Sequence, residues 1–212
     1  MLHPHRRTTV ARVTVEAGAK TARYRISTGK QKRLSSLTTR PTTKADEQII
    51  GEISFRSHTI SFADFTPDGF VEEQVHEDQT SWWKQFLTPT DRGHQMFVVE
   101  ADWQVIGFSM VGPLNDRYDF YEQTKPMGEE GKLAVLYSIH IDPGHLGGGA
   151  GQRLMEISLD HLRNTGFETV VLDTVAANDR GRRFYDAGGW KVALMSESDE
   201  YGAVAIYRLQ LT

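Results

Sequence analysis

The residues best suited to chemistry lie between Pro143 and Gly151, where the sequence reads Pro-Gly-His-Leu-Gly-Gly-Gly-Ala-Gly. An apolar stretch at 133–141 precedes them and predicts a buried strand, and residues 152–164 predict an amphipathic helix. A glycine-rich turn before a helix aims several backbone N–H groups at one point, and only glycine lets the backbone approach a bulky anion there. We therefore predict a phosphate-binding turn. A tight connection whose glycines serve packing alone is the alternative.

Two common phosphate motifs do not describe this turn. A P-loop needs Lys-Ser or Lys-Thr after its last glycine, and neither pair follows Gly151. The dinucleotide motif Gly-x-Gly-x-x-Gly has a different spacing, and it requires an early strand in the domain, whereas this strand lies late in the chain.

Composition excludes several other classes of site. The 212 residues contain no Cys, which removes disulfides, a thiolate nucleophile and cysteine-ligated zinc. The eight His residues form no helical pair with an acidic third ligand, so we expect no metal. Because no apolar stretch approaches 18 residues and no secretory signal is visible, we expect a cytoplasmic protein without a membrane span.

The N-terminal region has a different charge from the rest. Residues 1–40 contain ten Lys and Arg and a single acid, Glu16, although the whole chain carries a net charge of −4. We interpret residues 1–35 as a basic, disordered extension and residues 36–212 as one domain. A nucleic-acid tether, a transit-like leader and an extension without a role are the alternatives for residues 1–35, and nucleic-acid binding is not favoured elsewhere.

The elements that would hold the glycine turn alternate between helical and strand patterns. They predict an α/β (α+β) domain with a mixed, mostly antiparallel sheet flanked by helices and one central βαβ step. A polar loop covers 113–131, and a helix is predicted to begin after Thr42 or Thr43. Further helices are predicted at 71–87 and after Asn178, and strands at 37–41, 95–100, 104–111, 133–142, 168–175, 190–195 and 203–211.

At this point the chain resembles the GCN5-related N-acetyltransferases (GNAT). Their pyrophosphate turn, Arg/Gln-x-x-Gly-x-Gly/Ala between a strand and a helix, is similar to Leu146-Gly147-Gly148-Gly149-Ala150-Gly151. Their Asn-led helix carrying Phe-Tyr is similar to 178–190, which begins at Asn178 and contains Phe184-Tyr185. The resemblance covers residues 36–210 and implies the GNAT fold.

The resemblance also implies acetyl-CoA as co-substrate and an amine of a small molecule or protein as acceptor. By position, Tyr185 is implied as the acid that protonates the departing thiolate, and Asn178 as a CoA contact. The backbone of Ile139, His140 and Ile141 is implied to contact the pantetheine arm, and residues 146–151 the pyrophosphate. The oligomeric state stays open, with a homodimer as one alternative.

Many family members carry a glutamate near the start of the strand before the turn, where it serves as the general base. This sequence has Val135 at that position. The candidate replacements are His140, Glu130, Glu129 and Glu100, with Tyr137 as a residue that could position a water. Alternation along the strand predicts that His140 points away from Val135 and Tyr137. A non-catalytic acyl-CoA sensor of the same fold is therefore the alternative function. The predicted acceptor walls are Phe55, His58, Phe62, Phe65, Trp82, Trp83, Tyr118, Phe120 and Tyr121, with Asp64, Asp116, Asp119 and Glu122 among them.

Overall fold

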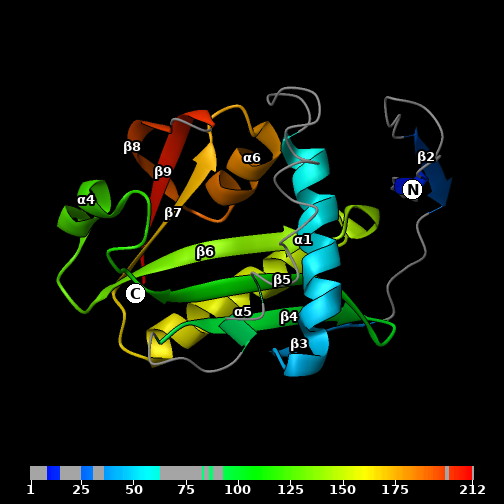
Figure 1. Cartoon of the computed structure of the whole chain (residues 1–212), viewed down its shortest axis with the longest axis horizontal. Coiled ribbons are helices and arrows are strands. Elements are labelled where there is room, and N and C mark those ends of the chain that lie inside the picture. Colours follow the sequence, from blue (N-terminus) through cyan, green and yellow to red (C-terminus); the bar gives the residue numbers. More distant parts are fainter. Residues whose placement is uncertain are drawn as a thin grey trace, which may run out of the picture.

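A seven-stranded sheet carries the site, with one long helix on each face (Figure 1). The computed structural model describes residues 36–62, 83, 86–87, 93–198 and 201–211, and two further strands in the N-terminal region. The strands of the sheet are β3 (Leu37–Pro41), β4 (Gln95–Ala101), β5 (Gln104–Pro113), β6 (Leu133–Ile141), β7 (Thr169–Val175), β8 (Lys191–Ser198) and β9 (Gly202–Gln210). The helices are η1 (Lys44–Asp46), α1 (Glu47–Phe62), α4 (Tyr121–Thr124), η2 (Lys125–Met127), η3 (Pro143–His145), α5 (Ala150–Asn164) and α6 (Asp179–Ala187).

The sheet order is β3-β4-β5-β6-β7-β9-β8, and β6–β7 is the one parallel pair. All other neighbours are antiparallel, as the sequence predicts. Helix α5 links β6 to β7 and completes the predicted βαβ step, because parallel neighbours need a crossover connection.

Helix α5 covers one face of the sheet and α1 covers the other (Figure 1). The predicted apolar face of α5 is buried through Leu154, Met155, Leu159 and Leu162, and it packs on inward-facing residues of β4–β7 and β9. On the opposite face, Ile50 and Ile53 of α1 pack with Met96, Val98, Phe108 and Met110. These two layers fix β6 at the centre of the domain.

Some predicted elements differ in detail. The polar segment at 113–131 contains α4 and η2, so it is not a loop throughout. The predicted helix at 71–87 lies mostly outside the described residues, although Trp83, Phe86 and Leu87 are helical. Within residues 1–35, β1 (Thr9–Thr14) and β2 (Arg25–Lys30) pair as a separate antiparallel sheet, and the domain boundary at residue 35 stays a prediction. None of the helices described is long and apolar enough to cross a membrane.

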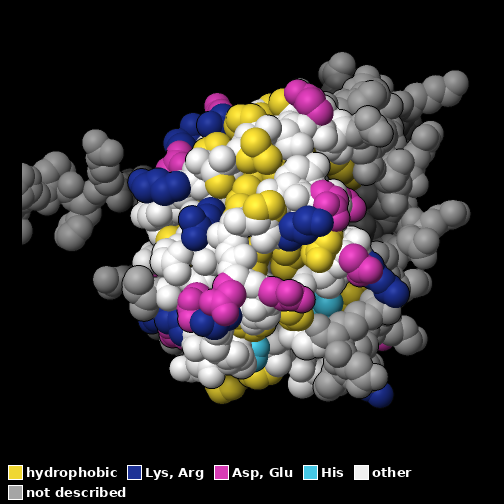
Figure 2. Space-filling model, turned by 90° about the vertical axis from the view of Figure 1, so that its left-hand side faces the viewer, with side chains coloured by type: hydrophobic (Ala, Val, Ile, Leu, Met, Phe, Trp, Pro, Cys, Tyr) yellow, Lys and Arg dark blue, Asp and Glu magenta, His cyan; other side chains and the backbone are white. Residues whose placement is uncertain are grey.

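Strand β8 forms one edge of the sheet and exposes apolar side chains. Val192, Leu194 and Met195 are 43%, 38% and 51% exposed. Hydrophobic side chains also gather on the face that Figure 2 shows, which is the side where Figure 1 places β8 and α4.

Candidate active site

The glycine turn has the conformation that its sequence requires. Gly147 and Gly149 have φ values of +79° and +88°, in the left-handed region that favours glycine. Gly149 is the N-cap of the 15-residue helix α5, and a Cβ placed on Gly147 would meet no atom within 4 Å. Open space therefore adjoins the positive end of a helix dipole, which suits a phosphate group.

An ion pair ties this turn to α1. The Asp142 carboxylate accepts the Gly144 N–H at 3.0 Å, and Arg56 Nη2 of α1 donates to Asp142 Oδ2 at 2.6 Å. Burial alone would raise the pKa of Asp142, but the neighbouring His145 ring, 3.7 Å away, the hydrogen bond from Gly144 and the charge of Arg56 lower it to about 2. Asp142 thus stays ionised and holds the start of the turn against α1.

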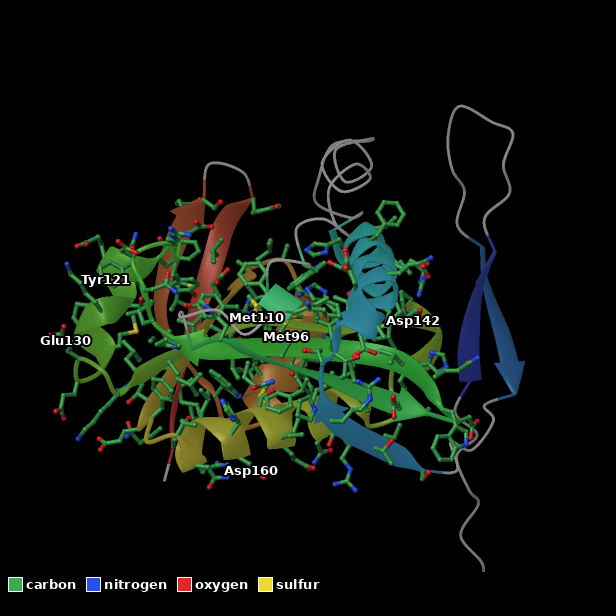
Figure 3. The ribbon with its side chains drawn as sticks, turned by 60° about the horizontal axis from the view of Figure 1, so that its bottom comes forward. Met96, Met110, Tyr121, Glu130, Asp142 and Asp160 are labelled. Carbon is green, nitrogen blue, oxygen red and sulfur yellow. The ribbon has the colours of Figure 1, made fainter. Side chains whose placement is uncertain are left out.

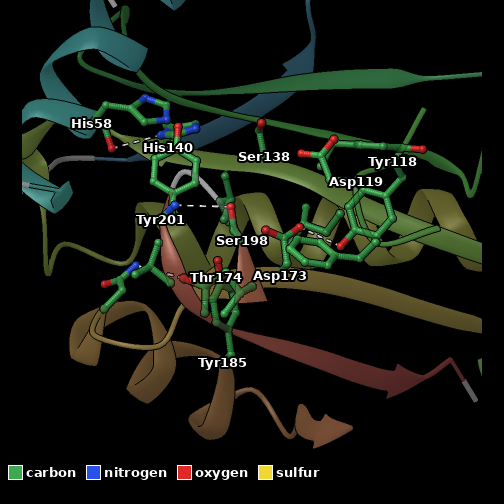
Figure 4. Close-up of a pocket in the computed structure, with 18 of the residues that line it drawn as sticks. His58, Tyr118, Asp119, Ser138, His140, Asp173, Thr174, Tyr185, Ser198 and Tyr201 are labelled. Atoms are coloured by element: carbon green, nitrogen blue, oxygen red, sulfur yellow. Dashed lines mark hydrogen bonds between the residues drawn. The ribbon is translucent and has the colours of Figure 1, made fainter. Parts of the chain in front are cut away.

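A cleft opens where β6 and β7 separate. Residues Leu133–Val135 of β6 pair with Thr169–Val171 of β7. The residues of β6 that follow Val135 do not pair with β7. The cleft has a volume of about 590 Å³, and β6 lines it from Leu136 to His140 (Figure 4). An exposed strand edge offers N–H and C=O groups to an extended ligand. Ile139 and His140 belong to the lining of this cleft, whereas Ile141 does not.

The predicted direction of the His140 side chain is wrong, because β6 contains a bulge. Met110 of β5 pairs with Ser138 and Val111 pairs with Leu136, which leaves Tyr137 as the extra residue. The extra residue reverses the alternation, so His140 shares the α1 face with Tyr137. There its ring stacks on Phe108, with centroids 5.1 Å apart, and lies 4.7 Å from the ring of His58.

His140 is held firmly in this position. Its Nδ1 lies 3.1 Å from Ser57 Oγ of α1. Burial, followed by the charge of His58, lowers the pKa of His140 well below its usual value, and burial also lowers the pKa of His58. Both imidazoles are therefore neutral near pH 7, and protonating His140 is unfavourable.

Helix α6 supplies the opposite wall. Asn178 caps it, since Asn178 Oδ1 accepts the Gly181 N–H at 3.0 Å and Nδ2 donates to Thr174 Oγ1 at 3.2 Å. Tyr185 is 9% exposed and packs between Trp190 and Tyr207, with ring centroids 6.1 and 5.6 Å away. Both Asn178 and Tyr185 line the cleft. Burial and the charge of Asp173 raise the pKa of Tyr185, so its hydroxyl keeps its proton.

One functional candidate was missed by the sequence reasoning. Asp173 of β7 lines the cleft two residues beyond Val171, and its Oδ1 accepts the Tyr118 hydroxyl at 2.7 Å. Asp173 is the one exposed residue of β7, and it lies in the lining of the cleft. The signal in the sequence was one charged residue inside the apolar run 169–175.

The other predicted residues lie in the cleft lining, away from it, or outside the described residues. Glu130 is exposed in the turn before β6 and is not part of the cleft lining; Figure 3 places it near Tyr121, at the opposite end of the sheet from Asp142. Leu146 is 37% exposed at the turn. Of the predicted acceptor walls, the cleft includes His58, Trp83, Tyr118, Asp119 and Phe120, whereas Asp64, Phe65 and Trp82 lie outside the described residues.

Comparison with known proteins finds similarity to acetyltransferases. A family model described as "Acetyltransferase (GNAT) family" matches residues 59–190. Mycothiol acetyltransferase of Frankia alni is 32% identical over 42% of the chain and 26% of its own length. The enzyme of the same name from Thermobispora bispora is 34% identical over 32% of the chain and 24% of its own length. The chain thus spans about a quarter of the length of these relatives.

Solved structures share the fold at low identity. The paia N-acetyltransferase of Thermoplasma acidophilum, crystallised with coenzyme A, superposes with a TM-score of 0.66 at 16% identity, covering 82% of this chain and 99% of that one. The yncA protein of Salmonella typhimurium, crystallised with its cofactor acetyl-CoA, gives 0.60 at 20% identity, covering 84% and 95%. The ribosomal-protein-S18-alanine N-acetyltransferase of Escherichia coli gives 0.59 at 17% identity, also covering 84% and 95%.

Proposed function

The chain belongs to the acetyltransferase (GNAT) family, and on that premise we propose that it transfers the acetyl group of acetyl-CoA to a primary amine by direct attack. The observation that carries the proposal is the junction of β6, β7 and α5. The glycine turn at the start of α5 follows directly on the unpaired edge of β6, and that edge leads into the cleft at Tyr185. An anion site that continues into an unpaired strand edge suits a long ligand with a diphosphate in its middle.

The residues proposed to bind CoA are mostly backbone donors. Leu146, Gly147, Gly148, Gly149, Ala150 and Gly151 are assigned to the diphosphate. The backbone of Ile139, His140 and Ile141 is assigned to the pantetheine arm, and Asn178 and Tyr185 to the end of that arm. Acetyl-CoA supplies an activated thioester, and a backbone N–H of β6 can polarise the thioester carbonyl.

Tyr185 is proposed as a proton relay. When the carbon–sulfur bond breaks, sulfur keeps the electron pair and needs a proton, which the Tyr185 hydroxyl can donate. The new amide nitrogen has one proton too many and can restore that hydroxyl. Because the hydroxyl is restored, the raised pKa of Tyr185 does not oppose net transfer.

The second candidate function is a non-catalytic acyl-CoA sensor. It is favoured by one observation. Val135 stands where the family's general-base glutamate would be, and it is fully buried in an apolar cluster with Leu133 and Val171. A side chain of this kind can neither bind nor remove a proton. The cytoplasmic location, the domain boundary at residue 35 and the homodimer stay predictions.

Binding and turnover distinguish the two functions. Calorimetric titration of the full chain with CoA is expected to show binding, and acetyl-CoA with a panel of primary amines is expected to release free thiol. Binding without thiol release across the panel would favour the sensor. No binding of CoA would contradict both functions.

A further inference from the structure

Asp173 stands at the point where β6 and β7 separate. The last parallel pair joins Val135 to Val171, so Asp173 is the next residue of β7 on the same face as Val171. That face is shared with Tyr118 and Ile206, which belong to one buried cluster with Val171. A carboxylate is thereby placed at the inner end of the cleft, beside the unpaired edge of β6 (Figure 4).

The carboxylate is oriented but not neutralised. Tyr118 donates its hydroxyl to Asp173 Oδ1, and among the described residues no Lys, Arg or His forms an ion pair with Asp173. The other ionisable side chains that line the cleft are His58, Arg117, Asp119, Tyr137, His140, Tyr185 and Tyr201. Arg117, Asp119 and Asp173 are all exposed residues of the lining, and the histidines are neutral near pH 7, so the lining carries two carboxylates against one cation.

The surroundings shift the pKa values of Asp173 and His140 in opposite directions. Desolvation, with a contribution from the charge of Asp119, raises the pKa of Asp173. Burial has the opposite effect on His140, whose pKa is lowered well below its usual value. Nearby protein favours the protonated form of a carboxylate and the neutral form of an imidazole, and the Asp173 carboxylate stays open to solvent through the cleft.

We infer that Asp173 is a catalytic residue that receives the ammonium group of the acceptor and takes its proton, with Tyr118 as the positioning residue. The inference rests on the proposed function, and it names the acceptor as a cationic primary amine. It also explains how the cleft can serve acetyl transfer although Val135 occupies the usual position of the base.

The protons balance across the reaction. The ammonium nitrogen starts with three protons and gives the first to the Asp173 carboxylate. The neutral amine then forms its bond to the acetyl carbon while the carbon–sulfur bond breaks. The second proton reaches the sulfur through the Tyr185 hydroxyl, and the third stays on the amide. Asp173 finally releases its proton to water.

The test compares wild type with Asp173→Asn and with Asp160→Asn, a control on the outer side of α5 (Figure 3) that removes an exposed carboxylate paired with Arg163. Calorimetry with CoA is expected to give the same affinity for all three proteins. A wild type that does not bind CoA contradicts the proposed function. A loss of CoA binding confined to Asp173→Asn contradicts the inference alone.

The decisive measurement uses n-butylammonium chloride titrated into each CoA-saturated protein. Wild type and Asp160→Asn are expected to bind it at least about tenfold more tightly than Asp173→Asn, because one charge-assisted hydrogen bond is lost. Equal affinities, or no binding in any of the three, overturn the inference.

Turnover separates proton transfer from positioning. With acetyl-CoA and n-butylamine, Asp173→Asn is expected to release thiol about 100-fold more slowly than wild type. With 2,2,2-trifluoroethylamine, which is largely neutral at pH 7, the loss should be much smaller because no proton has to be removed before attack. An equal loss with both amines would assign Asp173 a structural role and overturn the inference.

Discussion

Replacing Gly149 with alanine separates the shape of the glycine turn from its use as an anion site. Gly149 has a φ of +88° at the start of α5, and Gly166 has a φ of +89° just beyond the end of the same helix. A Cβ at position 149 would meet Leu37 at 3.8 Å, and one at position 166 would meet no atom within 4 Å. Neither substitution clashes, so each costs about 1–2 kcal/mol of left-handed backbone strain.

The two variants should therefore lose similar stability but differ in binding. In a chain of this size, 1 kcal/mol lowers the Tm by about 2–4 °C, so both are expected to melt about 2–8 °C below wild type. Gly149→Ala is also expected to bind CoA about 10- to 100-fold more weakly, because displacing one N–H from a phosphate costs about 1.5–3 kcal/mol. Gly166→Ala should keep the wild-type affinity.

Thermal denaturation and calorimetric titration with CoA check both quantities on the same preparations. Wild-type affinity in Gly149→Ala, at the expected loss of stability, would refute the assignment of this turn to the diphosphate. An equal loss of affinity in both variants would trace the effect to general destabilisation of α5.

Three further changes test the packing and the proton chemistry. Tyr185→Phe is expected to slow thiol release from acetyl-CoA about 100-fold at unchanged CoA affinity, and an unchanged rate would reduce Tyr185 to a packing residue. Ser158→Ala removes the partner of the buried Ser109 hydroxyl, 2.8 Å away, and should lower the free energy of unfolding in urea by about 1–3 kcal/mol. The double variant Ser109→Ala/Ser158→Ala should lose less than the sum of the two single losses, and strict additivity would speak against the hydrogen bond. The pKa of Asp142 is lowered to about 2, so its ionised form stabilises the fold above about pH 4 and this stabilisation disappears as the pH falls through about 2. Asp142→Asn should therefore be about 2 kcal/mol less stable than wild type at pH 6, and the difference should disappear as the pH falls below about 2, whereas a pH-independent difference would contradict the ion pair with Arg56.

Local patterns predicted the elements that position the site. The spacing of Leu154, Met155, Leu159 and Leu162 predicted the buried face of α5, and those residues are buried in the structure. Strand β3 has the bounds that its sequence predicted, and Asn178 caps α6 as expected. These features depend on neighbours within a few residues, and so sequence alone carries them.

The direction of His140 could not be predicted in the same way. Residues 136–140 read Leu-Tyr-Ser-Ile-His, with no glycine or proline to mark a bulge. The bulge exists because β6 is paired with β5, and the extra residue shows only in that register. The partnership of Tyr118 with Asp173 was equally hidden, because 55 positions separate the two residues and only the fold joins them.

The bulge and the separation of the strands together suit β6 to the two ligands proposed for it. Separation from β7 leaves the backbone of 136–141 free on one edge, where an extended cofactor arm can pair with it. The bulge turns both Tyr137 and His140 toward α1, so side chains on either side of Ser138 face the acceptor. In a regular strand, His140 would lie on the α5 side of the sheet, in the apolar core against which Ile139 packs. The irregular register would therefore allow one strand to offer its backbone to the proposed donor and its side chains to the proposed acceptor.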